Sequence, residues 1–123
     1  MDIVIENEIV SFKDLKVWQE GILLVKEIYH LCQSLPKEES LGLSSQLKRS
    51  ALSIPSNIAE GHSRQHRSEY RQFVYIALGS LAELETQIHI AGELKFMSAE
   101  ALKSISERVE YLRAMLLNLG RKL

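Results

Sequence analysis

The sequence predicts an all-α protein, folded as an antiparallel up-down-up-down four-helix bundle. Apolar residues recur at intervals of three and four through most of the 123 residues, the spacing that gives a helix an apolar face. The chain has only two prolines and six glycines, which is few for the many turns of a β-sandwich. Short connections between the expected helices make successive helices antiparallel neighbours.

The first helix is expected over residues 13–35, and it has more apolar surface than one neighbour can cover. It carries two parallel series with helical spacing: Leu15, Trp18, Ile22, Val25, Tyr29 and Cys32, and Val17, Gly21, Leu24, Ile28, Leu31 and Leu35. At about 100° per residue, the two series cover roughly 200° of the helix. We therefore expect this helix to be buried on two sides, and the protein to self-associate.

The second helix is expected over residues 44–61, after the polar connection at residues 37–40, with Gly61 as its C-terminal stop. Pro55 lies inside its apolar seam and removes one backbone hydrogen bond. Two outcomes are open: a kink at Pro55, or a helix that ends near Ser53 and restarts with Pro55 in its first turn. We favour the kink, because the seam continues in register.

Two further helices are expected, over residues 66–94 and from a cap at Ser98 to about residue 119. Residues 1–11 are interpreted as an N-terminal tail or short arm, and residues 12–123 as the single bundle domain. The N-terminus lacks the basic start and long apolar run of a signal peptide. No apolar stretch approaches the ~18 residues of a membrane span. These observations predict a cytoplasmic protein without a membrane partner.

Known bundle chemistries find little support in the sequence. A carboxylate-bridged dimetal site needs two Glu-x-x-His motifs, and only Glu27 with His30 matches, on an arc expected to face water. Glu85, His89 and Glu93 share a helix face, which is more typical of a solvated charged surface than of a metal site. Cys32, the one cysteine, falls in an apolar seam where a thiol is usually inert. We predict no enzyme activity, catalytic residue, metal, cofactor or small-molecule substrate.

The most distinctive stretch of the sequence surrounds Pro55. Its polar residues are interpreted as structural: Ser53, Ser56 or Asn57 would bind the carbonyl group freed by Pro55, and Glu60 would pair with Arg64 or with a base on the third helix. The alternative is a polar cluster at one end of the bundle that contacts a partner.

Cations gather around the junction of the second and third helices. Residues 46–72 contain only two acids, Glu60 and Glu69, against five bases: Lys48, Arg49, Arg64, Arg67 and Arg71. Arginines grouped at such a junction can bind phosphates, and Tyr70 could stack on a base, so we predict that this end binds RNA or another nucleic acid. The alternative is an ordinary solvated surface, since the net charge of the chain is only -1.

Several segments together resemble one protein family. They are residues 12–15, 17–18, 46–47, 53–61, 75–80 and 83–87. The chain resembles the bacterial four-helix bundle proteins encoded in intervening sequences of the 23S ribosomal RNA gene. This resemblance implies a homopentameric ring without an established activity. It also assigns Asn57, Glu60, Arg64, Glu83 and Glu85 to the family pattern, so we group Ser56, Asn57, Glu60, Glu83 and Glu85 as a structural polar cluster.

The resemblance also implies kinship with the accessory variability determinant proteins of diversity-generating retroelements. Those proteins are similar barrels that bind nucleic acid and a reverse transcriptase. An interaction adaptor of this reverse-transcriptase accessory type is therefore the alternative function. Its relatives are strongly basic, whereas this chain is slightly acidic.

Overall fold

A computed structural model describes residues 11–123; residues 1–10, nearly all of the expected tail, lie outside the described part. Four long helices follow one another: α1 (Lys16–Cys32), α2 (Leu43–His62), α3 (Arg67–Glu93) and α4 (Ala99–Lys122). Two short 3-10 helices, η2 (Phe12–Asp14) and η3 (Lys37–Glu39), precede α1 and α2. The predicted all-α class is confirmed, and the four helices lie where their apolar spacing placed them.

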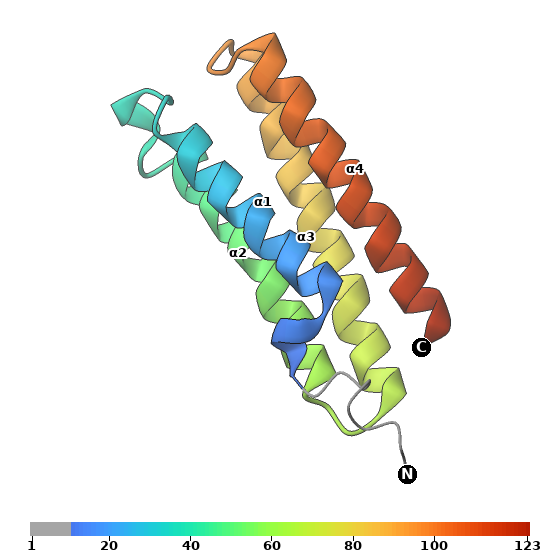
Figure 1. The fold of residues 1–123 in the computed structure, drawn as a ribbon. Helices are drawn as coiled ribbons and strands as arrows, with labels where there is room; N and C mark the ends of the chain where they lie inside the picture. The colour runs from blue at the N-terminus through green and yellow to red at the C-terminus, as the bar shows by residue number, and fades with distance from the viewer. Residues whose placement is uncertain (1–10) are drawn as a thin grey trace.

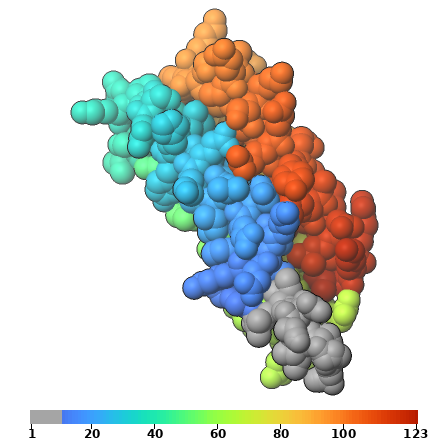
Figure 2. All heavy atoms as spheres, viewed as in Figure 1, coloured from blue at the N-terminus to red at the C-terminus, as the bar shows by residue number. Residues whose placement is uncertain are grey.

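The helices pack as an up-down bundle (Figure 1). Each helix contacts its neighbours in the chain, and α1 also contacts α4, while the diagonal pairs do not approach each other within residues 11–123. The contact between α2 and α3 is the most extensive, and that between α1 and α4 is the sparsest. Figure 2 shows that side chains fill the space that the ribbons leave between α1 and α4.

The core combines one apolar seam from each helix. Its largest fully buried side chains are Leu24, Ile28, Leu47, Ile54, Ile58, Leu81, Leu84, Ile105, Leu112 and Leu116. Of the two apolar series of α1, the one with Leu24 and Ile28 faces this core. Most of the other series remains half-buried, and Tyr29 is 40% exposed. Within residues 11–123, α1 is therefore covered fully on only one of its two apolar sides.

Helix α1 is shorter than predicted at both ends. Ser11 caps η2 by accepting a hydrogen bond from the Lys13 backbone N–H at 3.1 Å, and so it does not belong to the tail. Leu15 then has an extended backbone, with φ of -72° and ψ of 126°, which delays α1 until Lys16. A local cap signal marks the start of a turn, but it does not distinguish a 3-10 turn from a long helix.

Helix α2 continues through Pro55, so the alternative of a break at Ser53 is wrong. Pro55 has no backbone N–H, so the Ala51 carbonyl lacks its usual helical donor. The polar side chains nearby donate to other carbonyl groups instead. Asn57 Nδ2 donates to the Ser53 carbonyl at 2.7 Å, and Ser53 Oγ donates to the Ser50 carbonyl at 3.1 Å. Ser53 and Asn57 therefore do not donate to the Ala51 carbonyl, as had been expected of one of these side chains.

Gly61 has a different role from the predicted helix stop. It lies inside α2, and no glycine in residues 11–123 has a positive φ. A Cβ atom placed on Gly61 would lie 2.7 Å from Phe73 Cβ and 3.2 Å from the Tyr70 carbonyl oxygen. Glycine is thus required because α2 and α3 approach each other closely here.

Candidate nucleic-acid interface

Cationic side chains from three helical segments meet at one end of the bundle. The turn from α2 to α3 and the C-terminal end of α4 lie together at the lower end in Figure 1. We call this the cationic end and define it by Arg64, Arg67, Arg71, Arg121 and Lys122. All five residues are exposed.

Arg67 and Arg71 join the start of α3 to the last turn of α4. Arg67 donates a hydrogen bond to the Lys122 carbonyl, and Arg71 Nε donates to the Gly120 carbonyl at 3.3 Å. The last carbonyl groups of a helix lack intrahelical partners and carry partial negative charge, so cations stabilise them. The two arginines therefore have a structural role, and they draw Arg121 and Lys122 of α4 into the same surface.

Arg64 is held in place by two contacts. Its Nη2 lies 2.7 Å from Glu60 Oε2, which confirms the predicted pair, and its guanidinium lies 4.9 Å from the centre of the Phe73 ring. Both charged side chains of the pair remain about half exposed, so the pair contributes little to stability.

Lys48 and Arg49 do not belong to the cationic end. They lie near the opposite end of α2, and Arg49 is about 20 Å along the helix axis from His62 at a rise of 1.5 Å per residue. Lys48 Nζ lies 5.0 Å from the centre of the Tyr29 ring, and Arg49 donates to the Gln46 side chain. The prediction of one cationic region with five members was therefore wrong for these two residues.

The exposed aromatic residue at this end is Tyr75 rather than Tyr70. Tyr70 is half-buried, packs edge-on against His62 and has a buried hydroxyl group that finds no partner within residues 11–123. Burial raises the pKa of the Tyr70 hydroxyl. Tyr75 is 40% exposed, and the Arg71 guanidinium lies 5.1 Å from its ring centre. The spacing of four between Arg71 and Tyr75 is a signal that the sequence already contained.

The predicted polar cluster is dispersed. Ser56 is exposed between α1 and α2, whereas Asn57 bonds within α2, and Glu83 Oε1 accepts from Ser50 Oγ across α2 and α3 at 3.2 Å. The Ser53 and Ser80 hydroxyl groups also bond across this interface. Glu60 pairs with Arg64, as described above, and Glu85 pairs with Arg113 of α4. These residues contact different parts of the bundle and do not form one cluster.

A comparison with models of protein families places the chain in a family. The family model described as "23S rRNA-intervening sequence protein" matches residues 13–118. The chain belongs to this family. A search of curated proteins finds no match.

A solved structure supports the fold of this family member. It is a protein of unknown function from the S23 ribosomal protein family of Bacteroides thetaiotaomicron. It superposes with a TM-score of 0.79 over 85% of this chain and 97% of that chain. The two sequences are 23% identical, so the likeness extends to the fold alone.

A hollow lined in part by a serine, a histidine and a glutamate lies between α3 and α4 of this family member. It measures about 150 Å³ and includes Glu85, His89 and Ser106. His89 Nε2 lies 3.7 Å from Glu93 and Glu85 binds Arg113, and no hydrogen bond joins His89 to Ser106 within residues 11–123. The three side chains are thus not connected as a nucleophile, a base and an orienting acid.

The same described residues offer neither a metal site nor a membrane span. Residues 11–123 contain no group of three or more His, Cys, Asp or Glu side chains that could hold a metal ion. None of their helices is long and apolar enough to cross a membrane. The Cys32 thiol is buried, which raises its pKa and keeps it in its unreactive protonated form.

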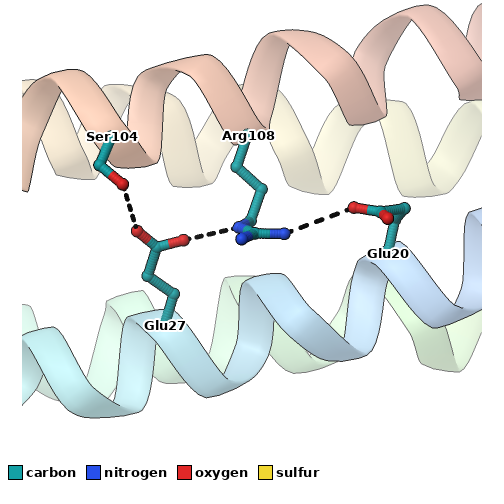
Figure 3. A network of polar contacts seen from close by, with 4 residues as sticks. All are labelled: Glu20, Glu27, Ser104 and Arg108. Carbon is teal, nitrogen blue, oxygen red and sulfur yellow. Dashed lines mark hydrogen bonds and ion pairs between the residues drawn. The ribbon is translucent and has the colours of Figure 1, made fainter.

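Glu27 was expected to face water, but it forms part of a network between α1 and α4 (Figure 3). Arg108 Nε donates to Glu27 Oε1 at 2.7 Å, and Arg108 Nη1 lies 3.4 Å from Glu20 Oε1. Ser104 Oγ donates to the other Glu27 oxygen at 3.1 Å. Arg108 is 81 residues away from Glu27 in the sequence, so helical periodicity could not reveal this pairing.

Proposed function

We propose that this family member is a non-enzymatic binding protein that holds RNA at the cationic end. The observation that carries the proposal is the meeting of Arg64, Arg67 and Arg71 with Arg121 and Lys122 at the junction of α2, α3 and α4. Five bases stand there against Glu60 and Glu69, although the chain as a whole is slightly acidic. Such a local surplus attracts a phosphate backbone without a basic overall composition.

Single-stranded or looped RNA suits this surface better than a long duplex. The arginines are anchored to carbonyl groups and aromatic rings, so their guanidinium groups are held in place before the ligand arrives. The exposed Tyr75 ring beside Arg71 offers a surface on which an unstacked base could pack. Preorganised cations next to an exposed ring are a common arrangement for binding unpaired nucleotides.

The proposal includes self-association, which would repeat the cationic end in each subunit. Its support is the outer face of α3, where Ile76 is 44% and Ile90 is 42% exposed. Gly79 lies between them, and a Cβ atom placed there would have no neighbour within 4 Å among residues 11–123, apart from its own turn of α3. Another backbone could therefore approach closely at this point. Light scattering during gel filtration measures the mass, and a monomer at high concentration would contradict this part of the proposal.

The RNA proposal is tested by titrating a structured RNA with a single-stranded loop at two salt concentrations. The double variant Arg121→Gln/Lys122→Gln removes two exposed charges. The matched control, Lys48→Gln/Arg49→Gln, removes two charges near the other end of α2. We expect weaker binding for the first variant only. The slope of log K against log salt should fall by about 0.7–0.9 for each phosphate group that the variant no longer neutralises.

Three results would contradict the RNA proposal. They are no binding at low salt, binding that is indifferent to salt, and equal reductions of affinity in the two double variants. The last result would indicate attraction by total charge rather than by the cationic end. The circular dichroism spectrum of each variant checks that the bundle is intact.

A further inference from the structure

An apolar groove lies between α1 and α2. It has a volume of about 290 Å³, and it is lined by Phe12, Trp18, Ile22, Val25, Leu52, Pro55, Ser56 and Ala59. It begins at Phe12 and Ala59, beside the turn from α2 to α3, and follows the two helices toward the middle of the bundle. Its α1 wall belongs to the half-buried apolar series that the core of residues 11–123 leaves uncovered. On the α2 wall, Leu52 is 45% exposed.

Three bases lie at the end of the groove that is nearer the middle of the bundle. Lys26 and Arg49 are exposed, and Arg49 lies one turn before Leu52 on α2. Lys48 Nζ lies 5.0 Å from the centre of the Tyr29 ring, and Tyr29 continues the apolar series of the α1 wall. This end of the groove is therefore positively charged.

At the Phe12 end of the groove, positive and negative charges balance. Glu60 follows the α2 wall and pairs with Arg64, and the exposed Lys13 and Asp14 follow Phe12 in η2. The two glutamates of α1 are turned toward α4 instead (Figure 3). The surroundings of the groove as a whole are therefore cationic.

The exposed surface of α3 has the opposite charge. Six exposed residues with helical spacing form it, and we call them the α3 stripe: Gln72, Ile76, Gly79, Glu83, Thr86 and Ile90. Residues 72–94 contain three glutamates but no lysine or arginine. Glu83 lies in the stripe and Glu93 one turn beyond it, whereas Glu85 binds Arg113 of α4. Arg71, which precedes the stripe, binds the end of α4. The α3 stripe therefore combines apolar residues with acids.

The groove and the α3 stripe lie on different faces of the bundle. Helix α2 contacts both α1 and α3, whereas α1 and α3 are diagonal and do not approach each other within residues 11–123. A single chain therefore cannot bring its own stripe into its own groove. A second copy can, and each copy offers both surfaces at the same time.

Charge decides which of these surfaces pair between two copies. Two α3 stripes would place acids against acids, and two grooves would place cations against cations, whereas a groove and a stripe carry opposite charges. Such charges select the partner surface more than they supply affinity, which comes from the burial of apolar side chains. Neutral substitutions of Lys48 and Arg49 therefore leave the contact in place.

We propose, building on the proposed self-association, that the α1–α2 groove of one copy binds the α3 stripe of a second copy. Ile76 and Ile90 of one copy pack on Trp18 and Leu52 of the other, and the open position at Gly79 lets the helices approach closely. Because the two surfaces differ, the contact is head-to-tail. Assembly therefore continues from copy to copy until a ring closes or an open chain forms.

Mixing two variants, each with one altered surface, tests this contact. Leu52→Glu places an acid in the groove, and Ile76→Glu/Ile90→Glu places two acids on the α3 stripe. All three side chains are between 42% and 45% exposed, so the core is not disturbed. By light scattering during gel filtration, we expect each variant alone to be a monomer. An equimolar mixture should form a dimer with one copy of each variant, because one intact groove and one intact stripe remain.

Two further measurements locate the contact. Leu23→Glu makes the same change at a 42% exposed position of α1 outside the groove, and it should assemble like the parent protein. Trp18 is the one tryptophan in the sequence and lines the groove. With Trp18→Phe added to the Leu52→Glu variant, the tryptophan left in the mixture belongs to the intact groove. Its quenching by acrylamide should decrease on mixing. Circular dichroism checks that the helices of each variant are intact.

Three results would overturn this proposal at a concentration at which the parent protein assembles. They are a Leu52→Glu variant with the mass of the parent assembly, an Ile76→Glu/Ile90→Glu variant with that mass, and a mixture that remains monomeric. Each of them leaves self-association and RNA binding intact as separate proposals. A monomeric parent protein, in contrast, would contradict the proposed self-association itself and this contact with it.

Discussion

The α2–α3 and α1–α4 interfaces are built on different physical principles. At α2–α3, small side chains and Gly61 let the backbones come close, and the polar groups that cross the interface are short serine side chains with one glutamate. At α1–α4, contacts are sparser, and the long side chains of Arg108, Glu20 and Glu27 bridge the helices. Short-range packing tolerates little change, whereas solvated ion pairs can lose a partner with only a small decrease in stability.

The largest effect is expected at the closest point of the α2–α3 interface. Gly61→Ala places a methyl group 2.7 Å from Phe73 Cβ, which cannot move without the α3 backbone. We expect the free energy of unfolding to fall by about 1–3 kcal/mol, as measured by urea denaturation. A variant as stable as the parent would show that α2 and α3 can separate freely, and the contrast between the two interfaces would disappear.

An intermediate effect is expected at the α1–α4 interface. Arg108→Met keeps the length of the side chain but removes both ion pairs, whose members are between 18% and 34% exposed. Because solvent screens these charges, we expect the free energy of unfolding to fall by about 1 kcal/mol, and by less in high salt. In a Glu27→Gln background the same substitution should have a smaller effect. A decrease that is insensitive to salt and to this background would mean that Arg108 acts by packing instead.

The smallest effect is expected on the outer face of α3, and it has the opposite sign. Gly79→Ala adds a methyl group where, apart from its own turn of α3, no atom of residues 11–123 lies within 4 Å, so the higher helix propensity of alanine should raise the free energy of unfolding by about 0.5–1 kcal/mol. Urea denaturation at low protein concentration measures this gain. A lower mass by light scattering at high concentration would sharpen the comparison, since it would show that another chain packs against Gly79.

Several features of the fold could be predicted from local sequence patterns. Ser98 caps α4 by accepting a hydrogen bond from the Ala101 backbone N–H at 3.1 Å, and Glu60 pairs with Arg64 one turn away. Both contacts join residues three or four positions apart, so the geometry of one helix brings them together. The same short range explains why the seams of Leu24 and Leu47 could be assigned to the core before any helix was placed.

The membership of the cationic end was predicted less well, because it depends on which segments of the chain lie close together in the folded protein. Lys48 and Arg64 lie within one short window of the sequence, yet most of the length of α2 separates them. Arg121 and Lys122 lie far along the chain but beside Arg67, since α3 begins where α4 ends. A count of charges within a sequence window cannot distinguish these cases.

The sequence by itself determined that this protein is four helices with one apolar seam each, and that α1 carries a second apolar side. Only the tertiary structure decided that Gly61 serves close packing, that Arg67 and Arg71 hold the end of α4, and that Arg108 bridges two glutamates of α1. The physical reason is that periodicity acts within a few residues along one helix. The pairing of helix faces is settled by packing between segments up to 88 residues apart.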